Sequence, residues 1–196
     1  RLSQQSGATL FMTLLTAFVS LLGRYSNSDD VVVGSPIANR TNREIEPLIG
    51  CFINTLVLRS DISGNPSFQG LLTRVKQVAL EAYDHQDIPF EKLVDALQPE
   101  RNLSNNPLFQ IMFILQNTPK IDFELPGLNI SPFEIKNDTA KFDLTLSVTE
   151  TVQGLDGRLE YNTDIFEAAT ISRMIGHFQV LLDAIIAQPN LPISSL

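Results

Sequence analysis

The sequence predicts an α/β fold, a two-layer sandwich in which helices pack on a mixed sheet of about six strands. Two runs, residues 49–59 and 108–116, are apolar on both faces, which is typical of interior strands covered on both sides. Two longer segments place apolar residues at intervals of three and four, as amphipathic helices do. No internal repeat and no long linker divides the chain, so we expect one unit.

Composition narrows the class of protein. The chain has 196 residues, of which 43% are hydrophobic and 18% charged, enough to bury a substantial core. A net charge of −8, with only 14 scattered Lys and Arg residues, argues against a nucleic-acid partner. The start at Arg1, without a secretion signal, suggests a piece of a longer protein, and we expect it to reside in a reducing cytoplasm.

The first half of the chain alternates helix and strand. Residues 8–22 are too short to cross a bilayer and carry a stripe of Thr and Ser, which predicts a buried helix and no membrane partner. A turn at 27–30 leads to a short strand at 31–33 and then to the run 49–59, which we expect to be the central strand. A helix capped by Asn65 follows and ends near His85.

The second half adds strands and a closing helix. A short helix runs from Pro89 toward its stop at Pro99, and a second interior strand follows at 108–116. Residues 128–135 and 142–152 read as strands, and Asp156-Gly157 predicts a tight turn before a hairpin partner at 159–162. A long amphipathic helix is expected over 167–187.

Few residues indicate chemistry. Asn54 is an amide inside an apolar run, so it must hydrogen-bond to backbone, water or a ligand. Cys51 is the only cysteine and reads as a small packed hydrophobe more than as a nucleophile. His85 and His177 have no partners at metal-ligand spacing, and no metal site is expected. His177 fits a solvated helix face, while His85 and Asp87 fit a helix end and a cap, with a general base at His85 as the less favoured reading.

Several longer motifs resemble one enzyme family. Residues 49–59, 85–91 and 101–108 read IGCFINTLVLR, HQDIPFE and RNLSNNPL, and they are similar to three ordered motifs of nonribosomal peptide synthetase condensation domains. Residues 34–40 (GSPIANR) and 142–146 (FDLTL) also resemble that family, although Asn102 stands where its motif often has aspartate. The resemblance runs nearly from end to end of the chain but covers only half of a condensation domain.

The resemblance implies a fold, a reaction and partners. Condensation domains have two lobes similar to chloramphenicol acetyltransferase, with a His-His-x-x-x-Asp-Gly motif in the first lobe and a tunnel between the lobes. This motif is absent here, so residues 1–196 resemble the C-terminal lobe. The implied activity joins two acyl groups as an amide, each carried on the 4'-phosphopantetheine of a peptidyl carrier protein. No cofactor bound directly to this chain is expected; the implied partners are the N-terminal lobe, the carrier proteins and a neighbouring adenylation domain.

The family also suggests roles for single residues. Ser35 and Asn54 would face the tunnel, and Arg40 would approach the phosphopantetheine arm of the acceptor. Ser35 could instead stabilise the turn before Pro36, Asn54 could make a purely structural hydrogen bond, and Arg40 could be a solvated charge. The resemblance assigns no catalytic residue to this chain, and we expect His85, Asp87 and Arg101 to be mainly structural.

Two other functions stay open. The chain could be a non-catalytic module that binds a carrier protein or a partner domain, which the missing histidines permit. It could also be a lobe of the related epimerisation domain, although the counterpart of residues 49–59 reads differently there.

Overall fold

The computed structural model describes residues 1–99, 106–116, 128 and 139–196 of the chain. Within these residues, five strands form one mixed sheet in the order β2-β1-β3-β4-β5. The outer pairs β1/β2 and β4/β5 are antiparallel, and β3 runs parallel to both β1 and β4. The strands are β1 (Asp30–Ile37), β2 (Asn54–Asp61), β3 (Ile111–Gln116), β4 (Leu144–Thr151) and β5 (Gly154–Tyr161).

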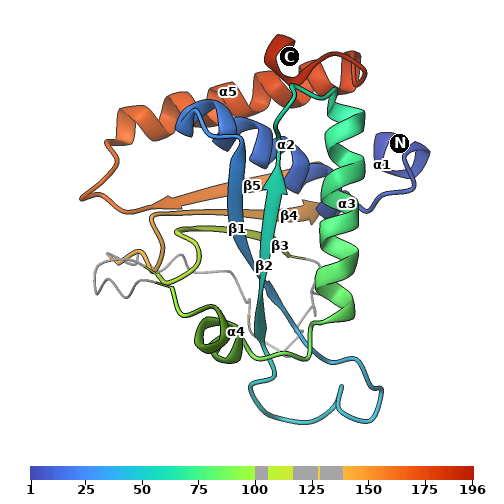
Figure 1. Ribbon diagram of the computed structural model, residues 1–196, viewed down its shortest axis with the longest axis vertical. Coiled ribbons are helices and arrows are strands. Elements are labelled where there is room, and N and C mark those ends of the chain that lie inside the picture. Colours follow the sequence, from blue (N-terminus) through green and yellow to red (C-terminus); the bar gives the residue numbers. More distant parts are fainter. Residues whose placement is uncertain (100–105, 117–127, 129–138) are drawn as a thin grey trace.

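Three long helices form the second layer. Helices α3 and α5 both pack against α2, which lies between them (Figure 1). Shorter helices lie at the N-terminus, after α3 and near the C-terminus. The helices are α1 (Leu2–Gln5), α2 (Leu10–Ser26), α3 (Phe68–Asp84), α4 (Phe90–Leu97), α5 (Ala168–Ala187) and the 3-10 helix η1 (Ile193–Ser195). The predicted α/β sandwich of sheet and helices is confirmed.

Helix α2 is the centre of the core. Thr9 caps it by accepting a hydrogen bond from the Met12 amide, and Asn27 ends it in a left-handed conformation. Apart from the exposed cap residue Thr9, the hydroxyl residues of the stripe predicted from the sequence are buried, and each donates to a backbone carbonyl one turn earlier. Thr16 and Ser20 donate to the carbonyls four residues earlier, at 2.7 and 2.8 Å.

The sheet turns one face toward the helices. Val33 of β1 pairs with Leu58 of β2, and both side chains are completely buried. Alternation along each strand places Leu56 and Ser60 on the same face as Leu58, so β2 is buried mainly on one side. This face and the inner sides of α2, α3 and α5 bury the main hydrophobic cluster.

The prediction of a central strand at residues 49–59 is wrong in two respects. In the part of the chain that the structure describes, β2 is an edge strand of the sheet, and it begins only at Asn54. The ladder with β1 ends at the pair Ile37 and Asn54, where β1 stops. Residues 49–53 therefore have no partner strand. Ile49 and Ile53 are exposed, and Cys51 is exposed too, contrary to its predicted packing.

An aromatic group covers part of the opposite face of the sheet. A Cβ atom on Gly34 would lie 2.2 Å from the Phe109 ring, so this glycine lets the buried ring rest directly on the β1 backbone. Phe109 stacks on Phe142 at 5.5 Å between centroids and meets Phe90 of α4 edge-on at 5.7 Å. Helix α4 is thereby joined to this side of the sheet.

Three local predictions need correction. Ser67 caps α3 and accepts from the Gly70 amide, because Asn65 instead adopts φ of 48° and accepts from the Ser194 amide. The β4/β5 turn comes before Gly154, whose φ of 135° suits glycine, so Asp156 and Gly157 lie within β5. The strand predicted at 128–135 lies outside the described residues except for Leu128.

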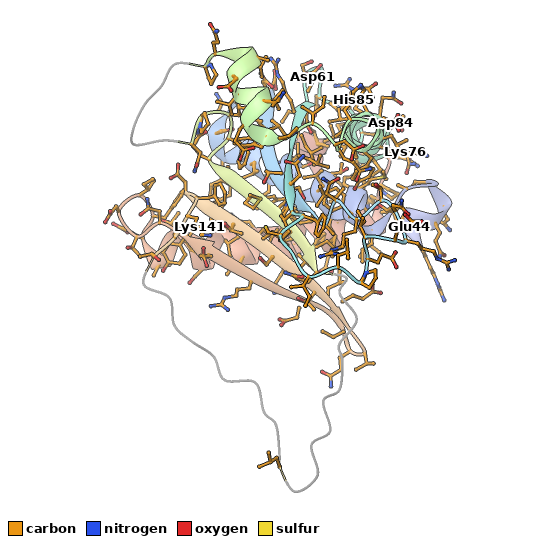
Figure 2. The ribbon with its side chains drawn as sticks, turned by 90° about the horizontal axis from the view of Figure 1, so that it is seen from below. Glu44, Asp61, Lys76, Asp84, His85 and Lys141 are labelled. Atoms are coloured by element: carbon orange, nitrogen blue, oxygen red, sulfur yellow. The ribbon has the colours of Figure 1, made fainter. Side chains whose placement is uncertain are left out.

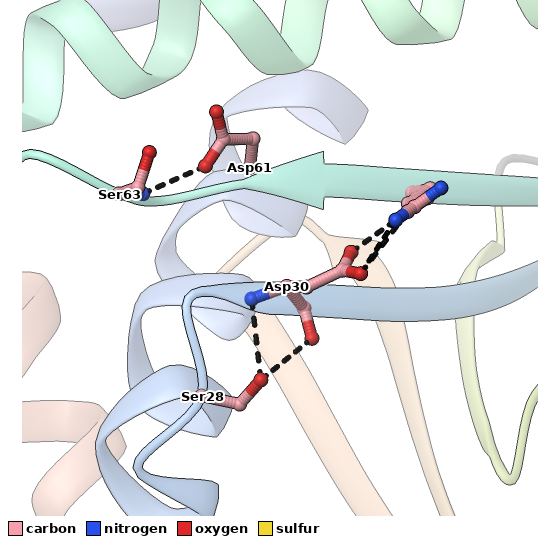
Figure 3. A network of polar contacts seen from close by, with 5 residues as sticks. Ser28, Asp30, Asp61 and Ser63 are labelled. Carbon is pink, nitrogen blue, oxygen red and sulfur yellow. Dashed lines mark hydrogen bonds and ion pairs between the residues drawn. The ribbon is translucent and has the colours of Figure 1, made fainter.

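Polar contacts fix the β1/β2 pair at its other end (Figure 3). The Arg59 guanidinium donates to both carboxylate oxygens of Asp30, with the shortest contact at 2.8 Å. These hydrogen bonds lower the pKa of Asp30 below its usual value. The hydroxyl of Ser63 chiefly lowers the pKa of Asp61, whose carboxylate also accepts from the Ser63 amide at 2.9 Å. The Arg59–Asp30 ion pair thus joins β1 to β2 at the end of the ladder away from residues 41–53.

Candidate functional site

A polar junction lies where three segments meet: the start of β2, the loop of residues 41–53 before it, and the connection from α3 to α4. In Figure 2, Glu44 marks the loop and His85 the end of α3. A cavity of about 260 Å³ opens at this junction. Its walls include Asn39, Phe52, Asn54, Asp87, Phe90 and Glu91.

Asn54 fastens the junction together. Its Nδ2 donates to the carbonyls of Gln86 and Ile88, at 2.8 and 2.7 Å, and its Oδ1 accepts from the Phe90 amide at 3.1 Å. Phe90 is the first residue of α4, and Pro89 at the N-cap offers no capping side chain. Asn54 therefore caps α4 from a strand more than thirty residues away. The predicted structural hydrogen bond is present, and Asn54 also lines the cavity.

Arg40 holds the loop in a similar way. Its Nη1 donates to the carbonyls of Ile45 and Glu46, the latter at 3.0 Å, and Nη2 donates to Gly50 O at 3.3 Å. The guanidinium carbon lies 4.3 Å from the centroid of the Phe52 ring, in a cation–π arrangement. Arg40 is half-buried, so the reading of an ordinary solvated charge is wrong.

Asn39 adds an unexpected feature to the cavity wall. Its φ of 51° is left-handed, which Asn tolerates better than most residues. Its Oδ1 is buried and has no hydrogen-bond partner among the residues described. An acceptor of this kind is a place where a water molecule or a ligand N–H could bind.

The histidines lie away from this cavity. His85 is the C-cap of α3, as expected, and its Nδ1 lies 2.8 Å from Glu81 O. His177 is exposed on α5, which agrees with its prediction, and its Nδ1 lies 2.8 Å from the Tyr25 hydroxyl. Asp87 lines the cavity and is exposed, but it does not cap α4, so that prediction is wrong.

The other predicted site residues are not gathered here. Ser35 is buried on the helix-facing side of β1, opposite Leu56, and does not line the cavity. Arg101 and Asn102 lie outside the described residues. Cys51 lines the cavity as an exposed residue. The structure thus brings Asn54 and Asp87 together and places Arg40 against Phe52, which lines the same cavity.

Two other features are absent from the described ranges. No three His, Cys, Asp or Glu residues there come together as a group able to hold a metal ion. None of the described helices has the length and apolar character needed to cross a membrane. The junction brings amide, carboxylate and aromatic groups together around a small cavity.

Comparisons with known proteins identify the family that this layered α/β fold belongs to. The model of the condensation domain family matches residues 1–196, and the chain belongs to this family. It is 54% identical over 197 residues to a linear gramicidin synthase of Brevibacillus parabrevis and 49% identical over 195 residues to malpinin synthetase of Mortierella alpina. Both matches cover 100% of this chain but only 2% of the relative.

Solved structures agree on the fold. A four-domain nonribosomal peptide synthetase bound to AMP and glycine superposes with a TM-score of 0.91 and 28% identity, over 100% of this chain and 16% of that one. The X-domain from teicoplanin biosynthesis gives 0.90 and 28%, over 99% of this chain and 45% of that one. The first condensation domain of the calcium-dependent antibiotic synthetase, at 18% identity and 0.76, supports the fold alone.

Sequence reasoning missed three parts of this site. Nothing in the sequence predicted that Phe52 would lie under Arg40, that Asn39 would be left-handed, or that Glu91 would line a cavity. Short spacing could have suggested only the first, because Arg40 directly precedes the loop that contains Phe52. The other two depend on how the α3–α4 connection meets that loop.

Proposed function

We propose that this chain is the C-terminal lobe of a condensation domain that forms an amide between two carrier-bound thioesters. The family match over residues 1–196 carries the proposal. The relatives named above are peptide synthetases at least one order of magnitude longer than this chain, so their activity comes to it only as part of this proposal.

The reaction defines what each half must supply. The acceptor amine attacks the donor thioester carbonyl, a C–N bond forms, the C–S bond breaks, and the amine proton ends on the leaving thiol. The amine must be held close to the carbonyl, and a positioned base assists its proton transfer. The sequence has only two histidines, and neither stands in a His-His-x-x-x-Asp-Gly motif. We assign the proton-handling histidine to the first lobe and substrate positioning to this chain.

The junction is the part of this chain that we assign to substrate. Asn54 and Phe90 tie β2 to α4, and the loop held by Arg40 forms the adjoining wall. The carrier proteins would present their substrates on phosphopantetheine arms, with an adenylation domain next along the same synthetase. Apolar side chains exposed beside the junction, Leu48, Ile49, Ile53 and Ile88, offer a surface for the first lobe.

An assay of amide formation tests the proposal. Two loaded carrier proteins should yield dipeptide with the full-length protein that contains this chain. The isolated 196-residue chain should give none above the uncatalysed background. Dipeptide formed by the isolated chain would place the chemistry here and overturn the division between the lobes.

A binding module is the second candidate. The fold also matches the X-domain in its complex with OxyB, at a TM-score of 0.88 and 28% identity, so a domain of this fold can form a complex with another protein. If the full-length protein binds loaded carrier proteins but makes no amide, this second candidate is correct.

A further inference from the structure

Residues 41–53 form a loop that the hydrophobic core does not shape. The loop contains no strand or α-helix, and its residues are exposed apart from Ile45 and Phe52, which are half-buried. Within the loop, the amides of Ile45 and Leu48 each donate to the carbonyl three residues earlier. The Glu44 amide donates to the side chain of Asn42. A loop with so little burial needs another source of order.

Arg40 supplies that order. For the described residues, every side-chain hydrogen bond that joins this loop to the rest of the chain comes from the Arg40 guanidinium. Its three bonds reach carbonyls five, six and ten residues ahead, so they hold the loop against the residue that directly precedes it. The Arg40 guanidinium also stacks on Phe52, so it contacts the end of the loop that lines the cavity.

The chemistry of the guanidinium suits this task. Three of its five N–H groups are already used by carbonyls, and its flat face lies over an aromatic ring. A lysine could neither stack in the same way nor reach three carbonyls in fixed directions. These contacts indicate that the Arg40 guanidinium binds groups of the protein itself and is not held free for a substrate.

We propose that Arg40 is a positioning residue, which orders the wall of the cavity at residues 50–54 and so places the acceptor substrate without contacting its phosphate. This inference rests on the proposed function. It differs from the expectation drawn from the family resemblance, in which Arg40 approaches the phosphopantetheine arm itself.

Two acceptors distinguish these roles. An aminoacyl group on a carrier protein has the phosphate of its arm, whereas an aminoacyl N-acetylcysteamine thioester has none. In the full-length protein, Arg40→Ala should raise KM for both acceptors by a similar factor, about tenfold, and Arg40→Lys should not restore it. Phe52→Leu should also raise KM for both acceptors. Arg43→Ala is the matched control, because Arg43 lies in the same loop and makes no hydrogen bond or ion pair with the described residues.

Three results would overturn the inference. The first is a loss confined to the carrier-borne acceptor, with rescue by lysine, which would show direct contact with phosphate. The second is an unchanged KM for both acceptors. The third comes from amide hydrogen exchange, where Arg40→Ala should speed exchange in residues 41–53 and leave α3 unchanged; unaltered exchange in the loop would contradict an ordering role.

The exchange measurement is independent of the proposed function. If the parent protein makes no amide with either acceptor, the proposed function fails, while faster exchange in the Arg40→Ala loop would still support Arg40 as the residue that orders it.

Discussion

Asn54 shows how one side chain can join distant segments. Its amide reaches the backbone of residues 86, 88 and 90 and replaces the cap that Pro89 cannot give to α4. The sequence predicted that this amide would have partners, because an unpaired polar group within an apolar run is costly. It could not predict which partners, because they lie 32 to 36 residues away and depend on how α4 docks.

Replacing Asn54 by Leu should therefore destabilise the fold. Three hydrogen bonds are lost and the α4 end is left uncapped, so the free energy of unfolding should fall by about 1–3 kcal/mol. Denaturant unfolding measures this loss. Asn190→Leu is the control, since Asn190 is exposed and makes no side-chain hydrogen bond with the described residues, and it should change stability by less than about 0.5 kcal/mol.

The kinetics of the same variant test its second role. If Asn54 also contacts substrate, the folded Asn54→Leu protein should turn over more slowly than its stability loss explains. Normal turnover by the folded fraction would leave Asn54 with its structural role alone.

Asp30 provides a prediction in pH. Because Arg59 lowers its pKa in the folded chain, the pair stabilises the fold above the ordinary Asp pKa of about 3.9, and this contribution is lost as pH falls through the lowered value. Arg59→Gln should raise the pKa of Asp30 toward the ordinary value in an NMR titration of its carboxyl carbon. Arg43→Gln should leave it in place. An Asp30 pKa that does not move in Arg59→Gln would mean that the ion pair does not persist in solution.

At the scale of elements, contact between α4 and the sheet depends on close packing at Gly34. Gly34→Ala would push a methyl group into Phe109, which Phe90 and Phe142 hold on its other sides. We expect a loss of about 1–3 kcal/mol in denaturant unfolding, typical of an overpacked core. Gly157→Ala, in a strand where nothing lies within 4 Å of the added atom, should have little effect.

A double variant tests the reason for that loss. In a Phe109→Ala background the methyl group has room, so Gly34→Ala should cost less than it does alone. Equal costs in the two backgrounds would show that the ring is not what Gly34 accommodates.

The long helices could be predicted from the sequence, and the place of β2 could not. Periodicity is a local property, so α3 and α5 could be recognised from their apolar spacing and α2 from its stripe of Thr and Ser residues. Whether a strand lies at the edge or in the middle of a sheet depends on the rest of the fold, and β2 pairs on one side only, with β1. The apolar residues 49–53, which suggested a central strand, lie outside the ladder. The turn predicted at Asp156-Gly157 is also wrong, because the chain turns earlier, just before Gly154 with its positive φ.

At the scale of the whole molecule, several exposed apolar side chains lie beside the junction, where we propose that the first lobe packs. Leu48, Ile49, Ile53 and Ile88 lie in the loop and the α3–α4 connection, and Ile49 is fully exposed. The isolated chain should bind a hydrophobic dye and self-associate, since such groups are usually covered in a finished protein. Replacing Ile49 and Ile53 by Ser should reduce dye fluorescence without lowering the free energy of unfolding, because neither side chain is buried. A monomer at high concentration with no dye binding would contradict the proposal that a first lobe covers this surface.

The proposal that this chain positions substrate while the first lobe handles the proton is tested most directly by the histidines of this chain. His85 ends α3 and His177 contacts Tyr25, so neither should handle the proton of the acceptor amine. In the full-length protein, the double variant His85→Ala/His177→Ala should form dipeptide within about twofold of the parent rate. Losing a general base typically costs about 10²- to 10⁴-fold. A loss of that size in a double variant that remains folded by circular dichroism would place the chemistry in this chain and contradict its role as the positioning half.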